Sequence, residues 1–403
     1  MGTGSCTPCP ETDTFDDPAF ARFSIRYCRQ ENLVFAFKRR GAIMKLGLKT
    51  IIAAAVAASF GGAAMADGSL TAVSWGGAYT KSQVEAYHKP FTAKTGVNVV
   101  SEDYNGGIAE VKAQVEAGNV TWDIIDVELS DAVRGCDEGI FEPIDPAILP
   151  PAPDGTPATE DFLPGTISEC GIATIVWSTI YAYDKSKLTS GPTSLADFFD
   201  LAKFPGKRGL RKTPKANLEM ALIADGVAPG DVYEMLGTPE GIDRAFAKLD
   251  TIKNDVVWWE AGAQPPQLLA DGEVVMTTAY NGRIFNAVAA EGKPFEIVWD
   301  GQVWDIDLWA IPKGAPNMEN ALEFLKFSTD TQRLADQAKW IAYGPARKSS
   351  APLVGKYNDG KIDMGPQMPT SPDNLKTAIQ NNFEFWADNQ DQLNERFNAW
   401  LAN

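Results

Sequence analysis

The sequence predicts an α/β protein in which mostly parallel strands are covered by helices on both faces. Short β-forming runs alternate with helical runs along residues 70–127, and the run at 122–127 is too apolar to have a face in water. Alternation of buried strands with helices is typical of parallel sheets. The predicted elements of this part are strands 70–74, 97–102 and 122–127 and helices 80–95 and 108–117.

The same alternation resumes after a Pro- and Gly-rich stretch at residues 143–165, which we interpret as a surface excursion. Thr238 followed by Pro239 indicates a helix start, because proline fits the first helical turn. Apolar residues at helical spacing predict a helix over the tail, residues 374–401. The remaining predicted elements are strands 173–183, 209–211, 274–280 and 306–311 and helices 195–201, 217–225 and 239–249.

Residues 44–66 have the composition of a bacterial secretory signal peptide. A basic start with Lys45 and Lys49 precedes an apolar run, and Ala-Met-Ala stands just before Asp67. The run is too short and too rich in Gly and Ala for a stable membrane span. We therefore expect the mature chain, from residue 67 onward, in the periplasm. Residues 1–43 are either the product of a start codon placed too early or a lengthened basic region of the same signal.

The charge balance and the histidine count exclude several function classes. Residues 1–66 hold 8 Lys/Arg and 5 Asp/Glu, so of the totals of 36 and 53 the mature chain keeps 28 basic and 48 acidic residues, a net charge near −20. Such a chain is not expected to bind nucleic acid or anionic lipid. The single histidine, His88, which we place on a helix surface, argues against a His-based triad or a multi-His metal site.

Two cysteines remain after removal of the signal, Cys136 and Cys170. In an oxidising compartment such a pair predicts a disulfide that closes a loop of about 35 residues. Two separate buried thiols are the alternative. Cys6 and Cys9 resemble half of a metal site, but no second pair with suitable spacing follows them, so no metal or cofactor is predicted.

Aromatic and charged side chains gather where predicted strands end, which is where ligands bind in α/β sheets. Aromatic faces attract an ammonium group by about 0.5–2 kcal/mol per contact, and a carboxylate adds a charge-assisted hydrogen bond. A tryptophan after a strand is also common in a core, and Trp258 and Trp259 cannot both face one side of a strand. The candidate ligand-binding residues from this pattern are Trp75, Tyr79, Asp126, Glu128, Trp258, Trp259, Tyr280, Arg283, Asp305 and Asp307.

Several segments resemble the periplasmic polyamine-binding receptors of ABC importers, over essentially all of residues 67–403. The segments are Trp75-Gly-Gly-Ala-Tyr79, Trp122-Asp-Ile-Ile, Ala279-Tyr-Asn-Gly282, Asp307-Leu-Trp-Ala-Ile-Pro312 and Tyr343-Gly-Pro-Ala. The resemblance implies a two-lobed Venus-flytrap fold that closes over one solute, each lobe a mostly parallel sheet flanked by helices. It also implies a membrane permease and a cytoplasmic ATPase as partners, with no enzymatic activity and no cofactor.

Carried over residue by residue, the resemblance implies that Trp75, Tyr79 and Tyr343 line the site with aromatic rings. Tyr280 stands where the family has a tryptophan on its hinge strand, and Asp307 matches a carboxylate that binds an ammonium group. The implied lobes are residues 67–175 with 280–340, and residues 176–279 with 341–403.

The departures from the diamine receptors concern charge. Arg283 stands where those receptors have an acid, and residues 211–216, where they place further acids, contain Arg211 but no carboxylate. A buried arginine beside an ammonium would cost several kcal/mol, whereas it would bind a carboxylate bidentately. We therefore expect a zwitterionic ω-amino acid such as γ-aminobutyrate, although Arg283 could instead form a structural ion pair.

Two other classes stay open at this point. A ferric-ion receptor of related fold would need clustered tyrosines, for which Tyr181 and Tyr183 share a strand face. An extracellular hydrolase would need an acid/base pair at a recognisable spacing, which the chain does not show. We expect a monomeric receptor for an amine-bearing or zwitterionic small molecule.

Overall fold

The computed structural model describes residues 68–188 and 190–403. The predicted signal peptide and the extension before it lie outside these residues. All described strands belong to one ten-stranded sheet in the order β2-β1-β3-β8-β4-β7-β5-β6, with β10 beside β8 and β9 beside β4. The strands are β1 Ser69–Ser74, β2 Asn98–Asp103, β3 Ile124–Glu128, β4 Gly171–Asp184, β5 Arg208–Arg211, β6 Val256–Trp259, β7 Met276–Tyr280, β8 Phe295–Ala310, β9 Gly344–Pro345 and β10 Ile379–Gln380.

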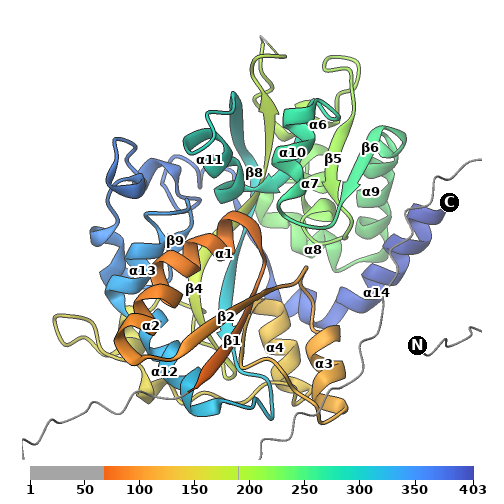
Figure 1. The fold of residues 1–403 in the computed structure, drawn as a ribbon. Coiled ribbons are helices and arrows are strands. Elements are labelled where there is room, and N and C mark those ends of the chain that lie inside the picture. The colour runs from red at the N-terminus through yellow and green to blue at the C-terminus, as the bar shows by residue number, and fades with distance from the viewer. Residues whose placement is uncertain (1–67, 189) are drawn as a thin grey trace, which may run out of the picture. The chain divides into compact units, whose positions relative to one another are not determined.

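Strands β4 and β8 lie at the centre of the fold, because they are long enough to run through both lobes. They pair with each other in antiparallel fashion along their whole length, with two register shifts. At one end, β8 also pairs with β3, and β3, β1 and β2 continue as parallel neighbours. At the other end, β4 pairs with β7, followed by the parallel strands β5 and β6. Figure 1 shows β4 and β8 running from one group of helices to the other.

Helices cover both ends of this sheet. The first continuous segment is α1 Gly77–Gln83, a π-helical turn Val84–His88 and α2 Lys89–Thr95, which ends at Gly96 with φ +82°. The others are α3 Ala109–Glu116, α4 Leu129–Asp137, α5 Ala158–Asp161, α6 Leu195–Phe199, α7 Asn217–Ala224, α8 Val232–Leu236, α9 Pro239–Asp250, α10 Gln264–Asp271, α11 Asn281–Ala289, α12 Met318–Ser328, α13 Thr331–Gln337 and α14 Phe383–Ala402. Each element predicted from the sequence has a counterpart here.

The buried apolar residues form separate cores on the two sides of the crossing strands. One core joins residues between 70 and 176 with residues between 306 and 346. Two others contain residues between 180 and 303, one of them together with Ile379 and α14. A fourth, largely aromatic cluster joins residues from both sides, and a fifth packs Phe285 of α11 against residues between 338 and 368. The implied division returns the chain to the first lobe at residue 280, but Ala279, Ile284 and Phe295 pack with Ile180 of β4. We therefore propose that the chain returns along β8, near residue 303.

Two local predictions are wrong. The tail helix begins at Phe383 and not at 374, because the Asn382 side chain caps it by accepting from the Phe385 amide, while Ile379–Gln380 pair with β8. His88 is buried, with 4% of its surface exposed, between the π-helical turn and the ring of Phe324. Burial lowers the pKa of His88 to about 4, so it is neutral at ordinary pH.

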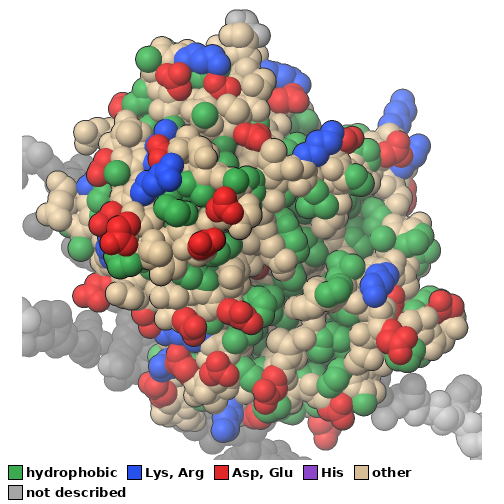
Figure 2. Space-filling view, turned by 180° about the vertical axis from the view of Figure 1, so that it is seen from behind, with side chains coloured by type: hydrophobic (Ala, Val, Ile, Leu, Met, Phe, Trp, Pro, Cys, Tyr) green, Lys and Arg blue, Asp and Glu red, His purple; other side chains and the backbone are tan. Residues whose placement is uncertain are grey.

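None of the helices in the described part of the chain has the length and apolar character needed to cross a membrane. Figure 2 shows acidic side chains spread over one face, with basic ones between them.

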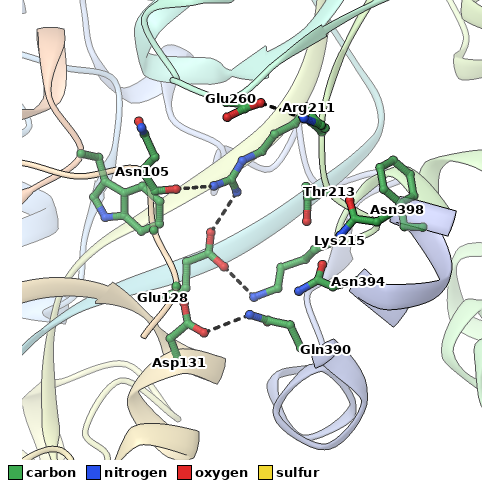
Figure 3. Close-up of a pocket in the computed structure, with 15 residues that line it drawn as sticks. Asn105, Glu128, Asp131, Arg211, Thr213, Lys215, Glu260, Gln390, Asn394 and Asn398 are labelled. Carbon is green, nitrogen blue, oxygen red and sulfur yellow. Dashed lines mark hydrogen bonds and ion pairs between the residues drawn. The ribbon is translucent and has the colours of Figure 1, made fainter. Parts of the chain in front are cut away.

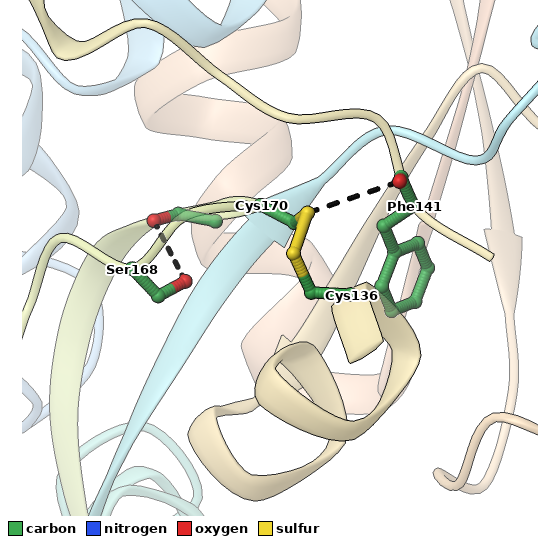
Figure 4. The surroundings of a disulfide bond; sticks show 5 residues. Cys136, Phe141, Ser168 and Cys170 are labelled. Carbon is green, nitrogen blue, oxygen red and sulfur yellow. Dashed lines mark hydrogen bonds between the residues drawn. A yellow bond between two sulfur atoms is a disulfide. The ribbon is translucent and has the colours of Figure 1, made fainter. Parts of the chain in front are cut away.

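A disulfide joins Cys136, near the end of α4, to Cys170, which directly precedes β4. The Cys170 sulfur lies 3.8 Å from the Phe141 carbonyl oxygen, and Cys170 is fully buried (Figure 4). The bond closes a loop with a sequence separation of 34. It therefore ties the excursion at 143–165 to the first lobe.

Replacing both cysteines with alanine is expected to lower the free energy of unfolding by about 3–4 kcal/mol, since the unfolded chain regains the entropy of an open loop. Urea unfolding followed by circular dichroism measures the loss. Neither cysteine lies near the cleft described below, so ligand affinity should not change. An unchanged unfolding midpoint would contradict a stabilising role.

Candidate ligand-binding site between the two lobes

Five aromatic rings from different elements surround a small cavity where the lobes meet. The rings belong to Trp75 after β1, Tyr79 of α1, Trp177 of β4, Tyr280 at the end of β7, and Tyr343. Trp177 and Tyr280 meet edge to face at 4.9 Å between centroids, and Tyr79 and Tyr343 at 5.4 Å. We call this space, of about 10 Å³, the aromatic cavity; Glu128, Arg283 and Asp307 complete its lining.

Asp307 supplies the carboxylate of the aromatic cavity. It lies on β8 directly opposite Glu128 of β3, and its Oδ1 accepts a hydrogen bond from Trp177 Nε1 at 2.6 Å. Burial, and then the charges of Asp126 and Glu128, raise the pKa of Asp307 well above its usual range. Two like charges facing each other across a strand pair are unfavourable, so this position gains from a cation.

Asp126 was predicted as a ligand-binding residue, and in the structure its carboxylate oxygens accept hydrogen bonds from side chains of the first lobe. The donors are Trp75 Nε1 at 2.9 Å, Tyr79 OH at 2.8 Å and Gln83 Nε2 at 2.7 Å. Asp126 is fully buried and does not line the aromatic cavity. Burial raises the pKa of Asp126 to about 7, against the opposing effect of these donors. Its role is to hold two aromatic walls in place.

Asp126→Asn is expected to lower the free energy of unfolding by about 1–3 kcal/mol, because at least one buried donor loses its acceptor. The looser walls should weaken binding of all ligands alike. Urea unfolding measures the loss of stability. Calorimetric titration with ligands of different charge distinguishes this indirect effect on the walls from a direct contact between Asp126 and the ligand. A change in the ratio of affinities between a diamine and a zwitterion would mean that Asp126 touches the ligand.

Three charged side chains form an ion triad across the cleft (Figure 3). Glu128 of the first lobe accepts from Lys215 Nζ at 2.6 Å and lies 3.5 Å from Arg211 NH1, both from the second lobe. Burial disfavours the charge of Glu128, but Lys215 and Arg211 outweigh it and lower its pKa. Lys215 also donates to Ser130 Oγ at 2.6 Å. Lys215 is thus the main partner of Glu128, and Arg211 is the looser one.

The two predicted arginines have different surroundings. Arg211, at the end of β5, lies with its guanidinium 5.8 Å from the ring centroids of both Trp75 and Tyr280, and it donates to the Asn105 carbonyl at 3.0 Å. Arg283 of α11 donates to the carbonyls of Gly76 at 3.0 Å and Trp75 at 2.8 Å. Arg283 therefore fastens the second lobe to the first, whereas Arg211 faces the aromatic walls.

The remaining predicted site residues are less directly placed. Trp258 packs against Phe397 and Trp400 of α14, which makes it a core residue of the second lobe. Trp259 is buried behind Tyr280, at 5.5 Å between centroids. Asp305 lies on β8 and does not line the aromatic cavity; burial and the charge of Glu128 raise its pKa to about 8.

Sequence reasoning missed Trp177 and Lys215. Trp177 is inside the apolar run of β4, where nothing distinguishes it from a core residue, although its register partner is Asp305. Lys215 follows Arg211 by four residues in the segment singled out for lacking acids. Its pairing with Glu128 depends on the approach of the two lobes, which no local pattern shows.

The tyrosines considered for a ferric ion lie elsewhere. Tyr181 is fully buried in the core of the second lobe and donates to the Ser194 carbonyl at 2.7 Å. Tyr183 belongs to the same core. Neither side chain reaches the aromatic cavity, so they do not form a ligand set there.

Comparison with known proteins gives concordant results. The family model of the bacterial extracellular solute-binding proteins matches residues 86–370. The γ-aminobutyric acid-binding protein of Pseudomonas aeruginosa is 49% identical over 345 residues, covering 85% of this chain and 94% of that protein. The putrescine-binding periplasmic protein SpuD of the same species is 23% identical, over 78% of this chain and 88% of that protein.

Solved structures of the two-lobed fold are also similar. MotA from A. tumefaciens B6 in complex with glucopine has a TM-score of 0.76 at 32% identity, covering 83% of this chain and 99% of that one. The Atu4243-GABA receptor has a TM-score of 0.69 at 32% identity, covering 83% of this chain and 97% of that one. The predicted fold class and the resemblance to amine-binding receptors are thereby confirmed. This chain belongs to the bacterial extracellular solute-binding proteins, which act outside the cytoplasm.

Proposed function

We propose that this protein is the periplasmic receptor of an ABC importer and that it captures a zwitterionic ω-amino acid, with γ-aminobutyrate as the preferred ligand. The observation that carries the proposal is the placement of opposite charges around shared aromatic walls. Asp307 of the first lobe lines the aromatic cavity, and Arg211 of the second lobe lies over Trp75 and Tyr280, which line the same cavity.

The ammonium end of the ligand fits the aromatic cavity. Trp75, Trp177 and Tyr280 present ring surface and edges there, and ring faces attract cations. Asp307 supplies a buried carboxylate whose charge the ligand would compensate. A charge-assisted hydrogen bond in a buried site is stronger than one between neutral groups.

The carboxylate end fits Arg211. Its contact with Glu128 is long at 3.5 Å, and Glu128 has a nearer partner in Lys215 at 2.6 Å. The planar guanidinium can therefore bind a carboxylate with two donors without leaving Glu128 unpaired. A second ammonium at this end would face two cations, which disfavours putrescine as the preferred solute. The 49% identical relative named for γ-aminobutyric acid supports the same choice.

Ligand contacts from both lobes would favour the closed form over the open one. Closure brings together Lys215 with Glu128 and Arg283 with the Trp75 and Gly76 carbonyls. We propose that the closed monomer then docks on a membrane permease served by a cytoplasmic ATPase, that the ligand is released unchanged, and that residues 44–66 are the export signal.

Isothermal titration calorimetry of the mature protein tests the ligand. γ-Aminobutyrate should bind at least about 100-fold more tightly than putrescine, which lacks the carboxylate, and more tightly than butyrate, which lacks the ammonium; each missing charged contact costs about 2–5 kcal/mol. Tighter binding of putrescine would contradict the zwitterion. Absence of any binding would contradict the receptor site itself.

A further inference from the structure

A second enclosed space, which we call the inner cavity, adjoins the aromatic cavity. It measures about 20 Å³ and shares the walls of Glu128 and Trp177 with the aromatic cavity. Its other walls include Thr179 of β4, Thr278 of β7 and Asp305 of β8. It therefore lies where the crossing strands enter the second lobe. Arg211 and Lys215 also line it, so the proposed ligand touches its Trp177 and Arg211 walls. Neither the family comparison nor the proposed ligand assigns an occupant to the space beside Asp305.

Three buried polar atoms of the lining have no hydrogen-bond partner among the described residues. They are Asp305 Oδ2, Asn381 Oδ1 and Trp259 Nε1, on side chains with at most 4% of their surface exposed. A buried polar group without a partner costs about 1–3 kcal/mol, and native structures rarely leave several such groups together. Three in one cavity indicate a missing partner common to all of them.

The chemistry of the three atoms defines that partner. Asn381 Oδ1 accepts a hydrogen bond and Trp259 Nε1 donates one, while Asp305 Oδ2 accepts when its carboxyl group is ionised and donates when it is protonated. A hydroxyl-type oxygen both donates and accepts, whereas an ammonium group cannot accept from the indole. One water needs about 10–15 Å³ of such volume and two to four polar partners, and the inner cavity offers both.

We propose that the inner cavity is a subsite for a single hydroxyl-type oxygen: a water molecule when the ligand carries no hydroxyl, and the hydroxyl of an ω-amino acid when it does. The water would donate to Asn381 and accept from Trp259, and it would donate to Asp305 when that carboxyl is ionised or accept from it when it is protonated. A ligand hydroxyl projecting past Trp177 would replace it and keep the bonds to Asp305 and Trp259. The ligand hydroxyl as occupant rests on the proposed function, whereas the water does not.

A crystal structure of the protein in its closed form tests the water directly. Ordered density within hydrogen-bonding distance of Asp305, Asn381 and Trp259 is expected. A cavity without density there would overturn the proposal, whatever the protein binds in the cleft.

Calorimetry with two ligands tests the ligand hydroxyl. Trp259→Phe removes the indole donor and keeps an aromatic ring behind Tyr280. Trp309→Phe is the matched control, because Trp309 is equally buried and its Nε1 also lacks a partner in the described chain, but it belongs to the core of the first lobe. Titrations with 4-aminobutyrate and 4-amino-3-hydroxybutyrate are compared for both variants.

If the ligand hydroxyl enters the subsite, Trp259→Phe should weaken the hydroxylated ligand about 5- to 10-fold more than 4-aminobutyrate, and Trp309→Phe should weaken both equally. If both ligands lose affinity equally in Trp259→Phe and the density is present, water is the occupant with either ligand. Failure of both ligands to bind the wild-type protein would refute the proposed function, while the density would still decide the subsite.

Discussion

Replacing Arg211 with methionine is expected to weaken the binding of γ-aminobutyrate by about 100-fold or more. The loss follows from removing one partner of a buried, charge-assisted pair, which costs about 2–5 kcal/mol. Methionine keeps the apolar stem against Trp75 and Tyr280, so the change is mainly one of charge and donors. Titration calorimetry at constant ionic strength measures it.

The neighbouring residue Lys212 provides the matched control. Lys212 lines the open part of the cleft beside Arg211 but not the aromatic cavity. It pairs with Glu260 at 3.1 Å and is 46% exposed, so Lys212→Met removes the same charge away from the aromatic rings. It should change affinity less than about 3-fold, as exposed ion pairs contribute at most about 1 kcal/mol. Equal losses in Arg211→Met and Lys212→Met would show a general effect of net charge and contradict a specific contact.

Arg283→Met distinguishes the roles of Arg283 and Arg211, both of which the sequence suggested as binders of the ligand's carboxylate. Arg283 donates to the Trp75 and Gly76 carbonyls across the cleft, so its loss should weaken every ligand by a similar factor. Arg211→Met should instead strengthen putrescine binding, because putrescine has no carboxylate to lose and its second ammonium then faces one cation fewer. The ratio of the two affinities therefore distinguishes a fastening role from a ligand contact.

The fold followed from the sequence because its cause is local. Apolar runs such as 122–127 fix buried strands, and Gly96 and Pro239 fix helix ends, each through backbone constraints acting within a few residues. The sequence did not indicate the return of the chain along β8 that we propose from the packing. Strands β4 and β8 pass through two lobes, and a long apolar run looks the same whether one core or two cores bury it.

The sequence indicated which residue types gather at the candidate site, but it did not indicate which of them hold the walls and which face the ligand. Period-two spacing correctly placed Asp305 and Asp307 on one face of a strand. However, Asp126 is occupied by Trp75, Tyr79 and Gln83, and such partners depend on tertiary contacts far apart in the chain. Long-range pairing decides whether a carboxylate holds a wall or meets a ligand.

Ligand binding is expected to release a proton from Asp307, so affinity should rise with pH. In the ligand-free protein, burial and then the neighbouring carboxylates raise the pKa of Asp307 well above its usual range, so Asp307 holds its proton to a higher pH than an exposed aspartate does. The ligand's ammonium favours the ionised carboxylate. The free protein therefore binds more protons than the complex, and raising the pH favours the complex by up to about tenfold per unit.

Two neighbouring buried acids, Asp126 and Asp305, make the stability of the ligand-free protein fall with rising pH, whereas ligand affinity is expected to rise. Asp126 and Asp305, with pKa values raised to about 7 and about 8, titrate in the same cluster as Asp307. Folded pKa values above those of the unfolded chain mean that the folded protein holds protons more tightly. The ligand-free protein should therefore lose stability as the pH rises from 6 to 8, and the ligand should restore it.

Asp307→Asn tests whether Asp307 is the residue that releases the proton on ligand binding. Asparagine keeps the shape of the side chain and accepts a hydrogen bond from Trp177, but it cannot ionise. The substitution should weaken γ-aminobutyrate about 100-fold and flatten the dependence of affinity on pH. Glu296→Gln, on the same strand but 51% exposed and paired with Lys185, is the control and should change neither. Titrations in buffers with different heats of ionisation count the released protons. Because Asp126 and Asp305 remain in Asp307→Asn, a slope that persists would assign the proton to those residues and remove Asp307 as the ammonium partner.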